Sequence, residues 1–163
     1  MRKLLPALLT AVSIFAMPVA ASEADFLQTL AGEWSGGGQI RLKPEDGPVD
    51  VTCELSSTTS ADAVSMRGTC SALIIMSREI GADLSVDGTS YSGTYTGSIH
   101  GPANLAGTRD GDTINLSVSW PDSGREAAMS LSATGNSLQI VTREAHAETQ
   151  EQIVTSQLSF QRQ

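Results

Sequence analysis

Basic side chains are scarce in this sequence, in which 10 Lys and Arg residues stand against 18 Asp and Glu residues. The few cations form no cluster or stripe of the kind that binds a phosphate backbone or an anionic lipid surface. The sequence therefore predicts no nucleic-acid partner. We interpret the acidity as a contribution to solubility, with an acidic docking face for a basic partner as the alternative.

Residue patterns that carry catalytic or metal chemistry are also missing. The two histidines, His100 and His146, have no cysteine or second histidine at ligand spacing, and nothing marks a Ser-His-Asp triad. The glycines at 36–38 are not followed by the Lys-Ser/Thr of a phosphate-binding loop, so they predict a strand that bends or packs closely against another element. We expect a protein that is not an enzyme and needs no metal or cofactor.

Cysteine is limited to Cys53 and Cys70, and no Cys-x-x-Cys redox motif is present. If the two cysteines oppose each other in a hairpin, Leu55 opposes Gly68 and the turn falls at positions 61–62. The apolar residues of both strands then share a face with the cysteines, and opposed strand residues meet the distance that a disulfide tolerates. The sequence therefore predicts one structural disulfide, formed in an oxidising compartment.

A signal peptide is predicted at the N-terminus. Arg2 and Lys3 precede an apolar stretch at 4–19, and small residues follow at 20–21. Two prolines interrupt the stretch, which is short against the roughly 20 residues that span a bilayer. We expect cleavage after residue 21, a mature domain at 22–163 without a lipid-modified N-terminal cysteine, and a periplasmic or secreted location.

The mature sequence alternates apolar and small polar residues, which is the pattern of half-buried strands. Only residues 23–31 look helical, with Ser22 as the cap. Turn signals that contain glycine separate the strands and favour a meander. The residues at 73–76 fit either a strand extension or a helical turn, and those at 144–151 either a loop or a short helix. Ten strands are predicted: 34–43, 49–56, 64–72, 81–86, 90–98, 103–109, 113–120, 126–133, 137–143 and 152–161. The fold class is thus an all-β antiparallel meander barrel of about eight to ten strands.

The alternation places Trp34 in the first strand and Arg162 at the end of the last strand on the apolar face. Gly32-Glu33-Trp34 resembles the Gly-x-Trp signature of the lipocalins and the wider calycin barrels. That resemblance implies a small barrel in which a basic residue near the C-terminus, here Arg162, packs over the tryptophan. The chain also resembles uncharacterised exported bacterial proteins that open with Gly-x-Trp-Ser-Gly-Gly-Gly, a likeness that implies no known activity.

Tyr91 and Tyr95 share a face beside glycine gaps, and Trp120 can join them across the sheet. His100 lies in the adjacent loop at 98–102. These four residues are the candidate ligand-binding residues, with ordinary core packing as the alternative for the tyrosines.

We expect a noncatalytic binding or envelope protein for a small apolar ligand, a glycan or a protein partner. One alternative is a proteinase inhibitor of the calycin type, which would use residues 22–31 as an arm. The other is a small outer-membrane barrel. The chain has only two Trp, two Tyr and three Phe for the aromatic girdles of such a barrel, so stable membrane insertion is not expected.

Overall fold

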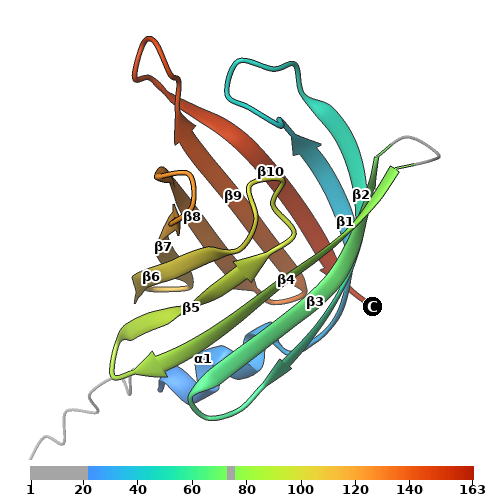
Figure 1. Cartoon of the computed structure of the whole chain (residues 1–163). Coiled ribbons are helices and arrows are strands. Elements are labelled where there is room, and N and C mark those ends of the chain that lie inside the picture. Colours follow the sequence, from blue (N-terminus) through green and yellow to red (C-terminus); the bar gives the residue numbers. More distant parts are fainter. Residues whose placement is uncertain (1–21, 73–75) are drawn as a thin grey trace, which may run out of the picture.

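The chain forms a closed antiparallel β-barrel (Figure 1). The computed structural model describes residues 22–72 and 76–163. Each strand pairs with the next along the sequence, and β1 pairs with β10 to close the barrel. The helix is α1 (Glu23–Leu30), and the strands are β1 (Gly32–Ile40), β2 (Val49–Thr59), β3 (Ala63–Ala72), β4 (Met76–Asp87), β5 (Ser90–Thr96), β6 (Ala103–Asp110), β7 (Thr113–Trp120), β8 (Arg125–Thr134), β9 (Ser137–Ala145) and β10 (Gln152–Arg162). The predicted all-β barrel with a short N-terminal helix is confirmed.

Two-residue alternation directs the side chains to the two faces of the wall. In β7, Ile114, Leu116 and Val118 are buried inside the barrel, while Asn115 and Ser117 are exposed outside. The other strands follow the same pattern, so the apolar residues form one core inside the barrel.

The two ends of the barrel differ in their connections. At the end near α1, the hairpins are tight, and Gly88, Gly111 and Gly135 adopt positive φ angles of 61°, 57° and 58° in the turns. Glycine takes this conformation at little cost. The opposite end carries the longer connections at 41–48, 97–102 and 146–151. We name these the closed end and the open end. Residues 146–151 form a loop. The short helix that the sequence also allowed for this region is therefore not formed.

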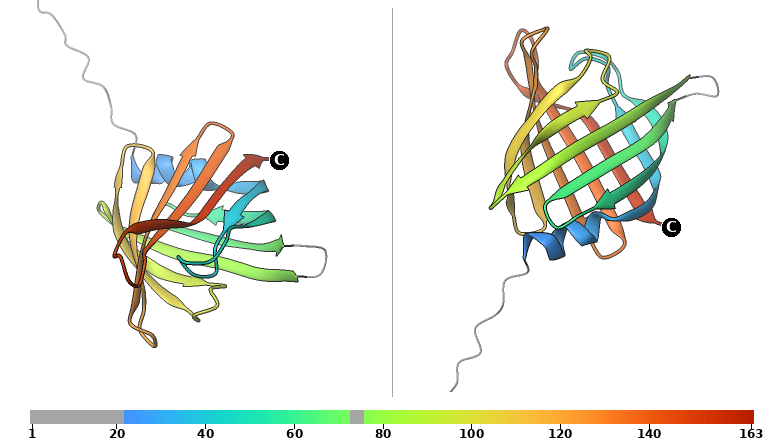
Figure 2. Two further views of the ribbon diagram at one scale, coloured as in Figure 1. Left: turned by 90° about the horizontal axis from the view of Figure 1, so that it is seen from above. Right: turned by 60° about the horizontal axis from the view of Figure 1, so that its bottom comes forward.

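The helix α1 lies across the closed end (Figure 2). Ser22 and Asp25 form a capping box that fixes the first turn. The apolar face of the helix, formed by Phe26, Leu27 and Leu30, is buried in the barrel core. Burial of three such side chains contributes on the order of 1.5–3 kcal/mol each. The closed end is therefore filled by side chains.

Arg162 fastens the C-terminal end of α1 to the barrel. Its guanidinium carbon lies 4.2 Å from the ring centroid of Trp34. The same group donates hydrogen bonds to the carbonyl oxygens of Ala31 and, at 2.7 Å, of Thr29. Trp34 in turn donates from Nε1 to the Leu30 carbonyl at 3.1 Å. Arg162 thus packs over Trp34 as the resemblance to the calycin barrels implies.

Glu23 fastens the other end of the helix. Its carboxylate accepts hydrogen bonds of 2.7 Å from the Tyr91 hydroxyl and from Nε of Arg109. Partial burial acts to raise the pKa of Glu23, but the hydrogen bonds from Arg109 and Tyr91 outweigh it and hold that pKa below its ordinary value. Arg109 also lies 4.6 Å from the centroid of the Phe26 ring.

Cys53 and Cys70 form a disulfide between opposed residues of β2 and β3. Leu55 opposes Gly68, so the predicted register is confirmed. The disulfide indicates an oxidising, extracytoplasmic location. The predicted signal peptide at 1–21 lies outside the described residues, as do residues 73–75. In the described ranges, no helix is long and apolar enough to cross a membrane.

The glycine run in β1 allows close strand approach, as predicted. A Cβ atom on Gly36 would lie 2.0 Å from the carbonyl oxygen of Ser159 in β10. One difference from the sequence-based expectation concerns β4, which begins at Met76 and not at Gly81. Its first four residues are all exposed, so they lack the alternation of buried and exposed side chains by which a strand is predicted from the sequence.

Candidate functional site

The inner wall changes character between the two ends of the barrel. Inward-facing residues near the closed end, such as Leu138 and Ile114, have no exposed surface. Toward the open end, several inward-facing apolar side chains are only partly buried, while others there, such as Val118 and Trp120, are buried. The partly buried set in the open half includes Ile40, Ile80, Tyr95, Ala127, Met129 and Ile140. The barrel is thus filled at the closed end, and burial of its apolar wall is less complete in the open half.

A polar cluster ends this apolar wall at the open end. Arg125 begins β8 and pairs with Glu144 of β9, with 2.5 Å between Nη2 and Oε2. Thr155 donates to the other carboxylate oxygen of Glu144 at 3.2 Å. Thr155 lies at a β-bulge between Val154 and Ser156, which turns its side chain inward. Partly buried hydrogen bonds between charged groups are among the stronger ones in proteins.

His100 and Trp120 lie together beside this ion pair. Their ring centroids are 6.0 Å apart and the ring planes meet at 78°. Trp120 ends β7 directly opposite Arg125 in the strand register. The loop that carries His100 is stabilised by a 3.0 Å hydrogen bond from the His100 amide to Oγ of Ser98. Burial and the nearby Arg125 lower the pKa of His100, while Glu144 acts in the opposite direction.

Three nitrogen atoms of this cluster are buried without a hydrogen-bond partner: His100 Nε2, Trp120 Nε1 and Arg125 Nε. In the described part of the chain, Ser57 Oγ is the only other side-chain atom in this condition. Each such atom costs roughly 1–3 kcal/mol relative to a satisfied one. Unpaired buried polar groups are rare in folded proteins, so three of them at one place call for a partner such as a water molecule, an ion or a ligand. We name His100, Trp120, Arg125 and Glu144 the mouth cluster.

The four predicted ligand-binding residues are divided between the two ends. His100 and Trp120 come together in the mouth cluster. Tyr95 lies on the inner wall two strands from Trp120, with Ala103 between them in the register. Tyr91 is at the closed end, fully buried and bonded to Glu23, so it fastens the helix and does not border the mouth cluster.

Arg125 and Glu144 were not among the residues selected from the sequence. The alternation along the strand does indicate their orientation. Arg125 is two residues from Ala127 and four from Met129, so its side chain faces inward as theirs do. Glu144 likewise shares parity with Ile140. The predicted strands 126–133 and 137–143 each end one residue short of these charged side chains, so the sequence-based strand bounds do not place them on the inner face.

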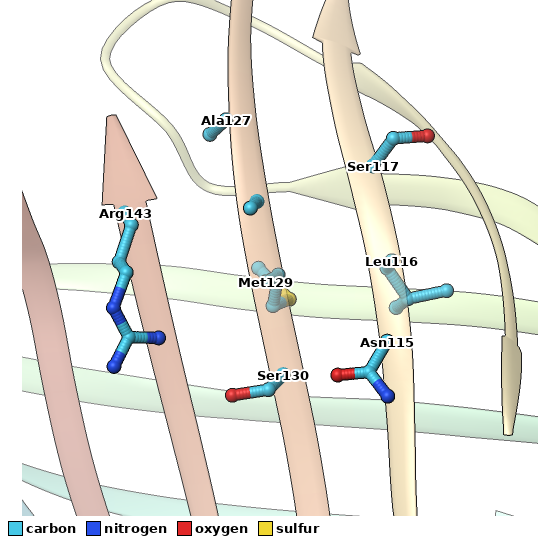
Figure 3. A pocket seen from close by; sticks show the side chains of 8 residues that line it. Asn115, Leu116, Ser117, Ala127, Met129, Ser130 and Arg143 are labelled. Atoms are coloured by element: carbon cyan, nitrogen blue, oxygen red, sulfur yellow. The ribbon is translucent and has the colours of Figure 1, made fainter. Parts of the chain in front are cut away.

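The outer wall carries a shallow hollow over β7, β8 and β9 (Figure 3). Small side chains such as Ala128 and Ser130 form its floor, and Asn115 and Arg143 stand at its sides. None of its polar atoms is both buried and unpaired, which distinguishes it from the mouth cluster. Among the described residues, no group of three or more His, Cys, Asp or Glu side chains is placed to hold a metal ion.

Comparison with known proteins supports the fold class. No family model matches the chain, and no curated protein matches it. Among solved structures, the chain is similar to the crystal structure of Rv2717c from M. tuberculosis, with a TM-score of 0.63 and 18% sequence identity. The match covers 86% of this chain and 98% of that chain. At this level of identity the likeness concerns the barrel fold alone.

Proposed function

We propose that this protein is a noncatalytic binding protein that takes a small apolar or amphiphilic molecule into the open half of a lipocalin-like barrel. The observation that carries the proposal is the inner wall itself. Several of its apolar side chains toward the open end are only partly buried, and it terminates in three unpaired buried nitrogen atoms. Such a surface gains free energy when an apolar ligand covers it and when polar ligand atoms meet the unpaired groups.

The filled closed end supports a single entrance for a ligand, at the open end. Phe26, Leu27 and Leu30 fill it, and the bonds of Glu23 and Arg162 hold the helix in place. A ligand must therefore enter between the loops of the open end. Large apolar side chains are exposed there, because Leu42 and Ile99 in the loops and Met76 at the start of β4 are 48%, 45% and 58% exposed. They give an apolar ligand a first contact.

The outer wall supports function in water and not in a bilayer. A membrane barrel presents an apolar outer band to lipid. Here the outward positions are filled largely by serine, threonine, amide and charged side chains. In β2 and β7 they are Asp50, Thr52, Glu54, Ser56, Asn115, Ser117 and Ser119. Together with the disulfide, this wall supports a location in the periplasm or outside the cell.

The position of residues 22–31 favours ligand binding over proteinase inhibition. An inhibitory arm has to be free to enter the active site of a protease. In this protein the segment is a helix with its apolar face buried in the core. Releasing it would expose Phe26, Leu27 and Leu30 and would break the bonds to Glu23.

The test is a pair of neighbouring alanine substitutions on opposite faces of β8. Ala127 faces the partly buried inner wall and Ala128 faces solvent. We expect N-phenyl-1-naphthylamine, a neutral apolar fluorophore, to bind the unmodified protein with a rise in emission. Ala127→Phe should weaken this binding at least tenfold, because the ring occupies the ligand space, and Ala128→Phe should leave it unchanged. Equal effects of the two substitutions, or no binding by the unmodified protein, would refute the proposal.

A further inference from the structure

The segment at 97–102 joins β5 to β6 at the open end and covers part of the inner wall. It places His100 against Trp120, the last residue of β7, with 6.0 Å between the ring centroids. Because β6 lies between β5 and β7 in the barrel, His100 reaches past one strand to make this contact. Trp120 is only 4% exposed, and His100 Nε2 and Trp120 Nε1 are both buried.

Few bonds hold this segment to the wall. In the described ranges, the hydrogen bonds of residues 98–102 are internal to the segment: Gly101 donates to the Ser98 carbonyl at 3.3 Å, and the His100 amide donates to Oγ of Ser98 at 3.0 Å. Gly97 and Gly101 stand on either side of His100 with φ angles of 104° and 85°. Glycine changes conformation in this region easily. The turn can therefore swing as a unit without rearranging β5 or β6.

His100 is the one residue of the segment that titrates near neutral pH. Charged side chains from three other elements act on it. They are Arg125 at the start of β8, Glu144 near the end of β9, and Lys43 in the connection at 41–48. Arg125 and Glu144 are paired with each other at 2.5 Å, and Lys43 is exposed. The environment of His100 therefore contains no carboxylate that is free to pair with an imidazolium.

The remaining acidic side chains at this end lie farther out in the connections. None of them is among the groups that shift the pKa of His100. Most are exposed, and charges at the surface are screened by water and salt. These residues are Glu45, Asp46, Asp122, Glu148 and Glu151.

Proton uptake favours a displaced segment over the observed one. In the observed arrangement, burial and then Arg125 lower the pKa of His100, Lys43 acts in the same direction, and Glu144 opposes them. In a displaced segment the imidazole is in water and has its ordinary pKa of about 6.5. The displaced form therefore binds a proton more tightly, and its population relative to the closed form increases by at most about tenfold per pH unit below that value.

The unpaired nitrogen atoms also reduce the cost of displacement. Trp120 Nε1 and Arg125 Nε carry a hydrogen and can only donate, yet both are buried without an acceptor. When the segment moves, water reaches these groups and satisfies them. The gain offsets part of the loss of contact between His100 and Trp120. The closed and displaced forms are thus closer in free energy than the burial of Trp120 alone implies.

We propose that residues 97–102 form a lid that swings away from Trp120 when His100 takes up a proton, and that this movement opens the barrel in mildly acidic surroundings. The inference rests on the proposed function, because it describes how a ligand reaches the interior. At neutral pH the lid is closed, and a ligand enters only during its brief openings. Below pH 6.5 the open fraction increases, and entry becomes faster.

A first experiment tests the lid without a ligand. Quenching of tryptophan emission by acrylamide is measured at pH 7.5 and 5.5, where Glu23 stays ionised because its pKa lies below 4.5. Trp34 is 1% exposed at the closed end, so a change reports on Trp120. We expect the quenching constant to be at least twofold larger at pH 5.5. His100→Phe keeps an aromatic ring and cannot be protonated, so its constant should be the same at both pH values.

A second experiment measures entry. The association rate of N-phenyl-1-naphthylamine should be at least threefold higher at pH 5.5 than at pH 7.5 in the unmodified protein. His146→Asn, the matched control in the connection at 146–151, should retain this increase. His100→Phe should bind the fluorophore slowly at both pH values. His100→Asn, which also cannot be protonated, replaces His100→Phe if that variant does not fold.

The two experiments separate the lid from the proposed function. Binding with equal rates and equal quenching at the two pH values would overturn the lid and leave the proposed function standing. A pH dependence that persists without the His100 imidazole would also overturn the lid, because another group would then control entry. Absence of fluorophore binding at both pH values would overturn the proposed function, and the quenching of Trp120 would still decide whether the segment moves.

Discussion

Arg162, the second-to-last residue, stacks on the ring of Trp34 at 4.2 Å and donates to the last carbonyls of the N-terminal helix. One side chain thereby joins the C-terminus, the first strand and the helix. A cation over an indole ring contributes roughly 0.5–2 kcal/mol, and a hydrogen bond from a charged donor about 1.5–3 kcal/mol. The arrangement therefore stabilises the helix α1 in its place across the closed end, where it forms the plug of the barrel.

Replacing Arg162 should loosen that plug. Arg162→Met keeps a long side chain but removes the cation and its donors, so we expect a loss of about 2 kcal/mol in the free energy of unfolding. Urea unfolding followed by circular dichroism measures it. Arg143→Met is the control, since Arg143 is exposed on the outer wall, and it should cost less than about 0.5 kcal/mol. Equal losses in the two variants would contradict the stacking role.

The disulfide should stabilise the hairpin of β2 and β3 through the unfolded state. Cys53 and Cys70 are 17 residues apart in the sequence, and closing a loop of this size contributes about 3 kcal/mol. Reduction with dithiothreitol should lower the free energy of unfolding by that order. A Cys53→Ala, Cys70→Ala double variant should be insensitive to the reductant. A reductant effect that persists in the double variant would show that another cause is at work.

Much of the wall could be predicted from the sequence because alternation is a local property. Residues 113–120 were predicted as a strand with the observed bounds, and Ile114 and Asn115 fall on the predicted faces. The register of Cys53 with Cys70 followed from one geometric condition. The packing of Arg162 over Trp34 was implied by the resemblance to the calycin barrels, and β1 and β10, which carry these residues, pair with each other.

The candidate site was harder to predict because it depends on the ends of strands. Arg125 and Glu144 face inward at the open end of the barrel, near the ends of their strands. A charged residue at the end of a strand usually indicates a solvent-exposed position. Tyr91 and Tyr95 share a face, yet they lie at opposite ends of β5. Their different roles depend on the direction in which β5 runs through the barrel. Tyr91, at the start of the strand, reaches Glu23 at the closed end, while Tyr95 lies in the open half.

The contacts of Glu23 predict an acid-sensitive plug. Its pKa is lowered in the folded protein by Arg109 and Tyr91 despite partial burial, so its contribution is fully present above the ordinary value of 4.5 and is lost as the pH falls through the folded value. Glu23→Gln should cost about 1–2 kcal/mol at pH 7 and progressively less below pH 4.5. Urea unfolding at pH 7, 5 and 3 measures the difference. Glu126→Gln, on the outer face of β8, should show no such trend.

His100 predicts a second pH dependence, nearer to neutrality. Burial and Arg125 lower its pKa below the ordinary value of 6.5, so the unfolded chain takes up a proton at a pH where the folded protein does not. Stability should therefore decrease as the pH falls below 6.5, by no more than about 1.4 kcal/mol per pH unit, until the folded imidazole is protonated as well. His100→Asn should remove this part of the slope between pH 7.5 and 5.5, and His146→Asn should retain it. If all three proteins have the same slope, His100 is not the titrating group.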